Sequence, residues 1–374
     1  MTKKIKVICV CGARPNFMKI APLMRAFRRQ VGFQTLLVHT GQHYDENMSK
    51  LFFDQLAIPK PDINLEVGSG SHAVQTAQIM ERFEPIVLDF QPHYVLVVGD
   101  VNSTIACGLV AVKLGVKLIH VEAGLRSFDR AMPEEINRVL TDSISDLLFV
   151  TEPAGMENLK NEGVNSHQAY LVGNVMIDTL LANREKAEQT EILSRFQLEP
   201  RHYGLITLHR PSNVDSPASL ISIFGAFAEI QKEMRLVFPI HPRTRKNIQK
   251  AGLEEMVAGM KNLLLLEPLG YLEFLNLTSH AAVVMTDSGG IQEETTILGV
   301  PCMTLRENTE RPITITQGTN RLVHTTTEDI LAKYRECTRK PLPAGHTCPE
   351  LWDGQAAERI VRIIAERFAG ETGR

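Results

Sequence analysis

Short segments rich in β-branched residues alternate with segments of helical hydrophobic spacing along the first half of the chain. Strands are predicted over residues 5–11, 34–39, 94–98, 116–121, 147–150 and 169–172. Helices are predicted between them, over residues 16–29, 45–55, 72–89, 103–114, 133–145 and 154–162. Because the strands are apolar throughout, we expect a parallel sheet with helices on both faces, as in a Rossmann-like domain.

The alternation restarts after a polar helical stretch at residues 179–195. Further strands are predicted over residues 203–208, 236–240, 263–266, 281–285 and 302–305. The α/β pattern therefore predicts two Rossmann-like domains in tandem, residues 1–173 and 174–353, with the last helix within 354–374 returning to the first domain. Tandem domains of this kind favour an active site in the interdomain cleft, at the carboxyl ends of the strands.

Composition narrows the class of partner. The 374 residues are 44% hydrophobic and 22% charged, as in an ordinary globular protein. A net charge of −3, with basic and acidic residues interspersed, indicates neither nucleic acid nor a membrane surface. The N-terminal apolar run is too short for a signal peptide, so a first strand explains it better. Six scattered cysteines lack metal-ligand or redox spacing, which indicates core residues in a reducing cytoplasm.

The stretch VVMTDSGGIQEE, at 283–294, is typical of a nucleotide-binding turn. A buried strand stops near Asp287 and turns through Ser288, Gly289 and Gly290 into a helix expected to begin near residue 291. Glycines allow close approach of a ligand, and the free N–H groups of a helix start bind phosphate. Glu294 would lie one turn into the helix, where it can accept hydrogen bonds from ribose. The alternative is an ordinary strand-to-helix turn capped by its serine.

Charged side chains follow several strands of the first half. Arg14 and Lys19 come after the first strand, Asp100 after the third and Glu122 at the end of the next. At this edge of the sheet the cations can bind an anion, and two neighbouring carboxylates form a candidate acid/base couple. The alternatives are a solvated turn arginine, a surface lysine and a loop-capping aspartate.

Three more segments are candidates for chemistry. Glu134 lies in the first turn of a helix that opens with proline, which is also ordinary helix-start chemistry. His209 follows the first strand of the second half, where an imidazole suits proton transfer. His241 and Arg243 follow the next strand, where we favour contact with substrate or phosphate over catalysis.

The motifs together resemble those of the non-hydrolysing UDP-N-acetylglucosamine 2-epimerase family. They run in order over about residues 5–323: GARPNFMKIAPL at 12–23, TGQHYDENM at 40–48, VVGDVNST at 97–104, HVEAGLRS at 120–127, PEEINR at 133–138, HRPSNVD at 209–215, TDSGGIQEE at 286–294, and TERP with GTNRLV at 309–323. The resemblance implies a two-domain fold of the glycosyltransferase-B type, a homodimer, and interconversion of UDP-N-acetylglucosamine and UDP-N-acetylmannosamine without metal or nicotinamide. It also implies elimination of UDP to a 2-acetamidoglucal, followed by re-addition.

Site residues are carried over by position. The resemblance implies four catalytic residues: Asp100, Glu122, Glu134 and His209. It implies substrate contacts from Arg14, Lys19, His241, Arg243, Ser288, Gly289, Gly290, Glu294 and Arg311. Among the carboxylates, the choice of base and acid depends on ring face and burial and stays open at this point.

Some positions depart from the family pattern. GARPNF replaces the more familiar GTRPE and is similar to relatives acting on UDP-2,3-diacetamido uronic acids, which leaves the substituents at C3 and C6 open. Gln42 and His43 fit a second, activating UDP-sugar site, but their surroundings differ from the regulated pattern, so we expect weak or absent activation. A hydrolysing epimerase, a glycosyltransferase of the same fold and a non-enzymatic nucleotide-sugar sensor are the competing interpretations.

Overall fold

The structure is a computed structural model that describes residues 4–41, 55, 56, 58–339 and 348–372. Its contacts divide the chain into two units, Met1–Ala182 with Glu350–Arg374 (unit 1) and Asn183–Pro349 (unit 2). The division falls within helix α7 (Val175–Glu188), which begins two residues after the predicted boundary at Gly173.

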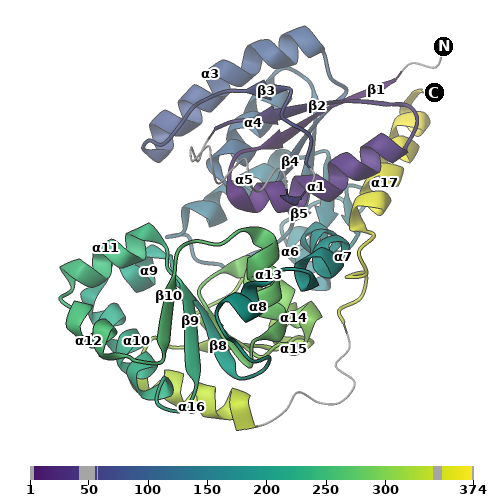
Figure 1. Cartoon of the computed structure of the whole chain (residues 1–374). Coiled ribbons are helices and arrows are strands. Elements are labelled where there is room, and N and C mark those ends of the chain that lie inside the picture. Colours follow the sequence, from purple (N-terminus) through teal and green to yellow (C-terminus); the bar gives the residue numbers. More distant parts are fainter. Residues whose placement is uncertain (1–3, 42–54, 57, 340–347, 373–374) are drawn as a thin grey trace. The chain divides into compact units, whose positions relative to one another are not determined.

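Unit 1 is built on a parallel sheet of seven strands in the order β3-β2-β1-β4-β5-β6-β7 (Figure 1). The strands are β1 (Ile5–Cys11), β2 (Phe33–His39), β3 (Ile63–Asn64), β4 (Tyr94–Val98), β5 (Lys117–Ala123), β6 (Leu147–Val150) and β7 (Ala169–Leu171). The helices are α1 (Arg14–Arg29), α3 (His72–Phe90), α4 (Asn102–Lys113), α5 (Pro133–Ile144), α6 (Pro153–Asn161) and α17 (Ala356–Thr372). The strand order reverses between β1 and β4, which makes the ends of these two strands the expected ligand edge of a Rossmann sheet.

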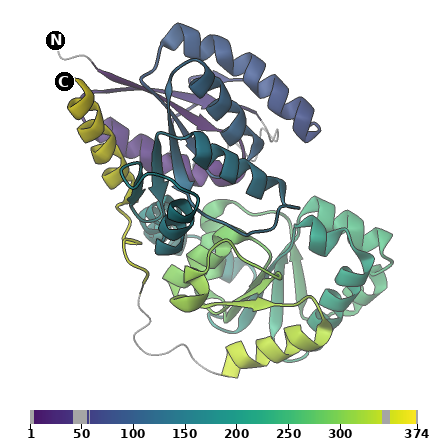
Figure 2. The ribbon, with the colours of Figure 1, turned by 180° about the vertical axis from the view of Figure 1, so that it is seen from behind.

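The last helix of the chain belongs to unit 1. Figures 1 and 2 show α17 lying beside α1 in both views. Asp178 of α7 accepts hydrogen bonds from the Ala356 and Ala357 amides at 3.1 and 2.7 Å, and so caps the start of α17. The indole of Trp352 donates to Thr151 O at 2.9 Å and fixes the segment that leads into the helix.

Unit 2 repeats the plan with six parallel strands in the order β10-β9-β8-β11-β12-β13. They are β8 (Tyr203–Thr207), β9 (Arg235–Pro239), β10 (Leu263–Leu266), β11 (Val283–Thr286), β12 (Cys302–Leu305) and β13 (Asn320–Val323). The helices are α8 (Ile192–Arg195), α9 (Pro211–Val214), α10 (Pro217–Ile230), α11 (Pro242–Lys250), α12 (Glu254–Gly259), α13 (Tyr271–His280), α14 (Gly289–Leu298), α15 (Ile313–Thr316) and α16 (Thr327–Arg339). Its order reverses between β8 and β11.

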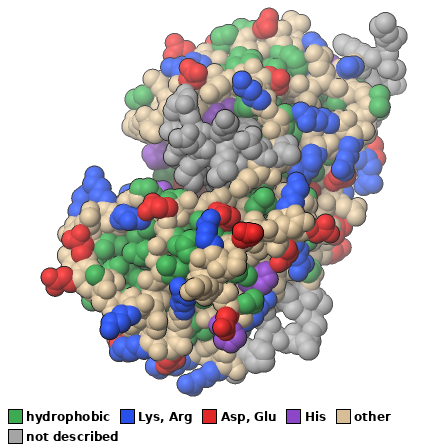
Figure 3. Space-filling model, viewed as in Figure 1, with side chains coloured by type: hydrophobic (Ala, Val, Ile, Leu, Met, Phe, Trp, Pro, Cys, Tyr) green, Lys and Arg blue, Asp and Glu red, His purple; other side chains and the backbone are tan. Residues whose placement is uncertain are grey.

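The predicted α/β fold with two parallel sheets is confirmed. Buried Val, Ile, Leu and Phe side chains pack on both faces of the unit 2 sheet, as expected for strands that are apolar throughout. Two short strands were missed, β3 and β13, because Asn64, Asn320 and Arg321 interrupt their apolar pattern. No helix in the described ranges is long and apolar enough to cross a membrane. On the face shown in Figure 3, described basic and acidic side chains are interspersed over each unit.

Candidate functional site

The first turn of unit 1 is fixed by a buried asparagine. Asn16, on the first turn of α1, accepts hydrogen bonds from the Gly12 and Ala13 amides at 3.2 and 2.9 Å and donates to Val98 O at 3.0 Å. It thereby joins the ends of β1 and β4, the two strands at the reversal of strand order. Arg14 begins α1, and its side chain lies outside what the structure describes.

Lys19 and Glu122 form a buried ion pair at this edge. Their side chains are 8% and 5% exposed, so neither the ammonium nor the carboxylate is solvated well enough to stay charged alone. Gly99 lies against them, since a Cβ there would be 2.9 Å from Lys19 Nζ. Lys19, predicted as a substrate contact, thus pairs with a candidate catalytic carboxylate.

Asp100 has a different cation. Arg138 Nη2 lies 2.5 Å from Asp100 Oδ2, and Arg138 Nη1 donates to Glu135 Oε2 at 2.6 Å. Asn137, also on α5, donates to Asp100 O at 2.9 Å. Asp100 and Glu122, which lie at the ends of neighbouring strands, are therefore each paired with a separate cation, and this offsets the repulsion between two carboxylates without a shared proton.

The helix start at Pro133 contains two glutamates with different environments. Glu134 is exposed, whereas Glu135 is buried and accepts from the Ser127 amide and hydroxyl and the Phe128 amide, each at 2.9 Å. Glu135 thus holds the preceding loop, and Glu134 is the one available to a substrate. Sequence reasoning chose Glu134 but missed Glu135 and the arginine it orients.

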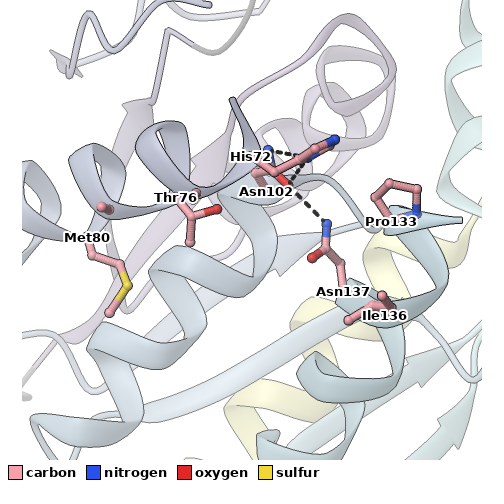
Figure 4. Close-up of a pocket in the computed structure, with 9 residues that line it drawn as sticks. His72, Thr76, Met80, Asn102, Pro133, Ile136 and Asn137 are labelled. Atoms are coloured by element: carbon pink, nitrogen blue, oxygen red, sulfur yellow. Dashed lines mark hydrogen bonds between the residues drawn. The ribbon is translucent and has the colours of Figure 1, made fainter. Parts of the chain in front are cut away.

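A cavity of about 440 Å³ adjoins this edge between α3, α4 and α5. Figure 4 shows Asn102 between His72 and Asn137, with the ring Nδ1 of His72 3.2 Å from Asn102 Oδ1. Met80, Pro133 and Ile136 make the rest of its wall largely apolar. Ser103 lies inside α4, with its hydroxyl 2.7 Å from that of Thr40.

In unit 2, His209 rests on a buried aspartate. Asp287, at the end of β11, is fully buried and lies 2.9 Å from His209 Nδ1. It also accepts from the His209 and Arg210 amides at 3.0 and 2.9 Å. Burial favours the neutral acid, but these contacts outweigh it and hold the pKa of Asp287 below its ordinary value. The His209 side chain is 49% exposed, so its other nitrogen is open to a reactant.

The predicted nucleotide turn follows directly after this aspartate. Ser288 occupies the N-cap position of α14, but its side chain makes no capping hydrogen bond, and the helix begins at Gly289 rather than near Ile291. A Cβ on Gly289 would lie 2.7 Å from Arg311 Nη1. A side chain at this position would therefore have to displace the guanidinium that packs against the turn.

Arg311 belongs to a buried cluster of charges. Its Nε lies 2.7 Å from Glu293 Oε1 and its Nη1 donates to Glu310 Oε1 at 2.7 Å. The Nη2 atoms of Arg306 and Arg210 lie 2.9 and 3.7 Å from Glu310 oxygens. Three guanidinium groups and two carboxylates are therefore in contact with one another, and the Arg311 guanidinium lies beside the glycine turn. The sequence indicated Arg311 alone.

Glu294 is buried deeper in α14. Tyr271 donates to Glu294 Oε1 at 3.2 Å. Burial, reinforced by the neighbouring Glu293, raises the pKa of Glu294 to about 7, although the tyrosine bond opposes the shift. A carboxyl group that is close to neutral at physiological pH can accept or donate a hydrogen bond to a hydroxyl.

The segment after β9 is engaged within unit 2. His241 caps α11, its Nδ1 accepting from the Arg243 amide at 3.2 Å. Arg243 Nε donates to Asp215 Oδ1 at 2.9 Å, and its Nη2 pairs with the other oxygen. The guanidinium fork is thus already directed at a carboxylate. The predicted second-site residues Gln42 and His43 lie outside the described residues.

Metal ligation was not expected from the sequence. Within the described residues, no group of three or more His, Cys, Asp or Glu side chains is arranged to hold a metal ion. Of the candidate acids, Glu122, Asp100 and Glu294 contact a lysine, an arginine and a tyrosine side chain respectively.

Comparison with known proteins gives consistent matches over the whole chain. Residues 25–365 match the family described as UDP-N-acetylglucosamine 2-epimerase. A UDP-N-acetylglucosamine 2-epimerase homolog of Methanococcus maripaludis is 46% identical, covering 96% of this chain and 99% of the relative. The UDP-2,3-diacetamido-2,3-dideoxy-D-glucuronate 2-epimerase of Pseudomonas aeruginosa is 41% identical, covering 97% and 100%. The crystal structure of Methanocaldococcus jannaschii UDP-GlcNAc 2-epimerase in complex with UDP-GlcNAc and UDP is 41% identical, with a TM-score of 0.88 over 97% of this chain and 100% of that chain.

Proposed function

The chain belongs to the UDP-N-acetylglucosamine 2-epimerase family, and from this membership we propose that it interconverts UDP-N-acetylglucosamine and UDP-N-acetylmannosamine without hydrolysis. The observation that carries the proposal is the set of acids and bases in the two units. Asp100 and Glu122 each have their own cation, and His209 is backed by a buried aspartate. Such groups are suited to moving protons at a sugar ring.

The proposed reaction has two balanced halves. A base removes the C2 proton while the C1–O bond to UDP breaks, so the electron pair of the C–H bond forms the C1=C2 double bond of 2-acetamidoglucal. UDP then attacks C1 again and an acid delivers a proton to C2 from the other face of the ring. No change of oxidation state occurs overall, and the steps require only acids, bases and stabilisation of the leaving diphosphate.

We propose that Asp100, Glu122, Glu134 and His209 supply these acids and bases. Glu134 is exposed and Asp100 is partly exposed, whereas Glu122 is buried. This difference in access favours Asp100 and Glu134 for direct proton transfer at the sugar. Glu122, bonded to Lys19, is suited to transfer a proton through that lysine or to orient it.

We propose that the turn Ser288–Gly290 binds the diphosphate. Its N–H groups open a ten-residue helix, and the Arg311 guanidinium lies beside it. Glu294, one turn further along, would accept hydrogen bonds from the ribose. Arg14 and Lys19 are proposed near the leaving phosphate. We propose that His241 and Arg243 contact the substrate, and that Arg243 leaves Asp215 in order to pair with it.

A second candidate substrate rests on one specific comparison. The Pseudomonas aeruginosa relative, named for UDP-2,3-diacetamido-2,3-dideoxy-D-glucuronate, is 41% identical, against 42% for a Methanococcus maripaludis relative named UDP-N-acetylglucosamine 2-epimerase. Overall identity therefore does not decide which substrate this chain takes: a sugar with a hydroxyl at C3 and a hydroxymethyl at C5, or one with an acetamido group at C3 and a carboxylate in place of that hydroxymethyl.

Product analysis decides between these substrates. The purified protein would be incubated separately with UDP-N-acetylglucosamine and with the diacetamido glucuronate, and products would be separated by anion-exchange chromatography. We expect an equilibrium mixture of the two UDP-N-acetylhexosamines and little free sugar. Conversion of the uronate alone would assign the second function, and free N-acetylmannosamine with UDP would assign a hydrolysing enzyme.

We also propose that the protein is a cytoplasmic homodimer. Val74 and Leu88 on α3 and Ile136, Val139 and Leu140 on α5 are between 37% and 58% exposed, an apolar surface suited to a second copy. Light scattering coupled to size-exclusion chromatography should give twice the chain mass of 41.8 kDa. A mass equal to one chain at micromolar concentration would contradict the dimer.

A further inference from the structure

Asp142 is a buried carboxylate that none of the proposed steps uses. It lies on α5 with its side chain 1% exposed. Its Oδ1 is 2.6 Å from His120 Nδ1, and its Oδ2 accepts from the Gly124 amide at 3.0 Å and lies 2.7 Å from Arg126 Nη1. Burial alone would favour the neutral acid, but His120, Arg126 and the Gly124 amide together hold the pKa of Asp142 below its ordinary value.

The two residues that Asp142 contacts, His120 in β5 and Gly124 just after it, lie on either side of Glu122. His120 is two residues before it and Gly124 two residues after it. Glu122 itself has φ +75°, a left-handed conformation that costs a residue with a side chain on the order of 1–3 kcal/mol. The pairing of β5 with β6 shifts register between Val121 and Ala123, so Glu122 is the residue of a β-bulge. Bulges re-aim a side chain, and this one directs Glu122 to Lys19.

His120 also contacts the turn that carries the other candidate carboxylate, Asp100. Its ring is fully buried and its Nε2 lies 2.8 Å from Gly99 O. Gly99, with φ +68°, precedes Asp100 and is also tied to β5 by its amide, which donates to Val121 O at 3.1 Å. The position of Asp100 therefore depends on a turn that His120 holds through its carbonyl.

Both nitrogens of the His120 ring face acceptors. A carbonyl oxygen and an ionised carboxylate cannot donate, so both contacts are hydrogen bonds only when the ring carries two protons. The charges around it then alternate from Glu162 through Arg126 and Asp142 to His120, with oxygen–nitrogen distances of 2.6 to 2.7 Å. Two acids and two cations balance, which is the arrangement that buried charges require.

We propose that Asp142 is a positioning residue that, with His120 held as an imidazolium, fixes the Glu122 bulge and the Gly99–Asp100 turn in their reactive placement. The inference rests on the proposed function, because it assigns Asp142 a role in the epimerisation chemistry of Asp100 and Glu122. Asp142 contacts no substrate in this proposal. Its effect should therefore fall on kcat rather than on KM.

The test compares Asp142→Asn with Glu162→Gln. Glu162 pairs with Arg126 in the same charge network but contacts neither His120 nor Gly124. We expect Asp142→Asn to lower kcat on the order of 100-fold, the effect of displacing a reacting group by about 1 Å, with KM within about threefold. Glu162→Gln should keep kcat within about threefold. His120→Gln, which keeps one donor for Gly99 O, serves as a second variant if Asp142→Asn does not fold, and should show the same selective loss of kcat.

A spectroscopic measurement tests the contact without turnover. In protein labelled with ¹⁵N-histidine, the proton on His120 Nδ1 should resonate well downfield of the other ring protons. That signal should vanish in Asp142→Asn and His120→Gln and persist in Glu162→Gln. A wild-type protein without that signal, or an Asp142→Asn enzyme with unchanged kcat, would overturn the inference. If the wild type shows the signal but does not turn over UDP-N-acetylglucosamine, the proposed substrate fails while the contact is supported.

Discussion

Replacing Glu294 with glutamine should stabilise the protein at alkaline pH. Glu294 lies in α14, 3% exposed, and receives a hydrogen bond from Tyr271 at 3.2 Å. Its pKa is raised from 4.5 to about 7, first by burial and then by Glu293. Because the raised pKa means that the folded state holds a proton that the unfolded chain releases, stability is lost as pH rises from about 4.5 to 7 and the loss is complete above that window.

The size of this effect follows from the shift. At about 1.36 kcal/mol per pKa unit, ionised Glu294 costs on the order of 3 kcal/mol above pH 7, and most of this cost appears between pH 5 and pH 8. Glutamine carries no charge, so the variant avoids this loss. The stability of Glu294→Gln relative to wild type should therefore rise by about 2–3 kcal/mol from pH 5 to pH 8.

Urea unfolding followed by circular dichroism at the two pH values measures the difference. The single tryptophan lies in unit 1, so its fluorescence would not report on α14. Glu255→Gln, at an exposed glutamate of α12, is the control and should change the difference by less than about 0.5 kcal/mol. An equal effect of Glu294→Gln at both pH values would refute the argument that burial holds this carboxyl neutral.

Three further substitutions test the contacts of the site. Lys19→Met should lower the unfolding free energy by about 3–5 kcal/mol, because it removes the cation that pairs with the buried Glu122 carboxylate. Adding Glu122→Gln should restore stability in urea unfolding but not activity, and a double variant no more stable than the single one would contradict this. Arg138→Lys cannot bridge two carboxylates at 2.5 and 2.6 Å, so kcat should fall on the order of 100-fold in a steady-state assay, and wild-type kcat would count against the bridge. Gly289→Ala should weaken UDP binding in calorimetry, because its Cβ would lie 2.7 Å from Arg311 Nη1 and displace that guanidinium. Gly259→Ala, where no atom lies within 4 Å of the added Cβ, should leave UDP binding unchanged. Equal affinities of the two variants would argue against a diphosphate at this turn.

The fold could be predicted from the sequence because its signals are local. Continuous apolar strands such as Tyr94–Val98 and Leu147–Val150 match the structure residue for residue, since burial on both faces leaves no other pattern available. The positions of the candidate residues Asp100 and His209, just after β4 and β8, could also be predicted, because parallel strands carry their carboxyl ends to one edge of a sheet.

The partners of the site residues could not be predicted in the same way. Asp100 is held by Arg138, which is 38 residues further along the chain, and His209 by Asp287, which is 78 residues further along. Such pairs depend on which strands become neighbours and on helix rotation, and periodicity fixes neither. The contact between Asp287 and His209 could have been suspected from the sequence, since each follows a predicted strand in the same half of the chain. The bulge at Glu122 could not be predicted from the sequence, because positive φ is expected at glycine and here it occurs at a glutamate.

Proton exchange at C2 of the sugar tests the central claim most directly. The protein would be incubated with UDP-N-acetylglucosamine in D₂O and the sugar followed by proton NMR, with His209→Asn as the comparison variant. We expect deuterium at C2 in both UDP-N-acetylglucosamine and UDP-N-acetylmannosamine, little free sugar, and a rate lower by about 10²–10⁴-fold in the variant. Formation of UDP-N-acetylmannosamine that retains protium at C2 would contradict the account, because one group removes the C2 proton and a different acid, exchanged with D₂O, delivers a deuteron to the other face.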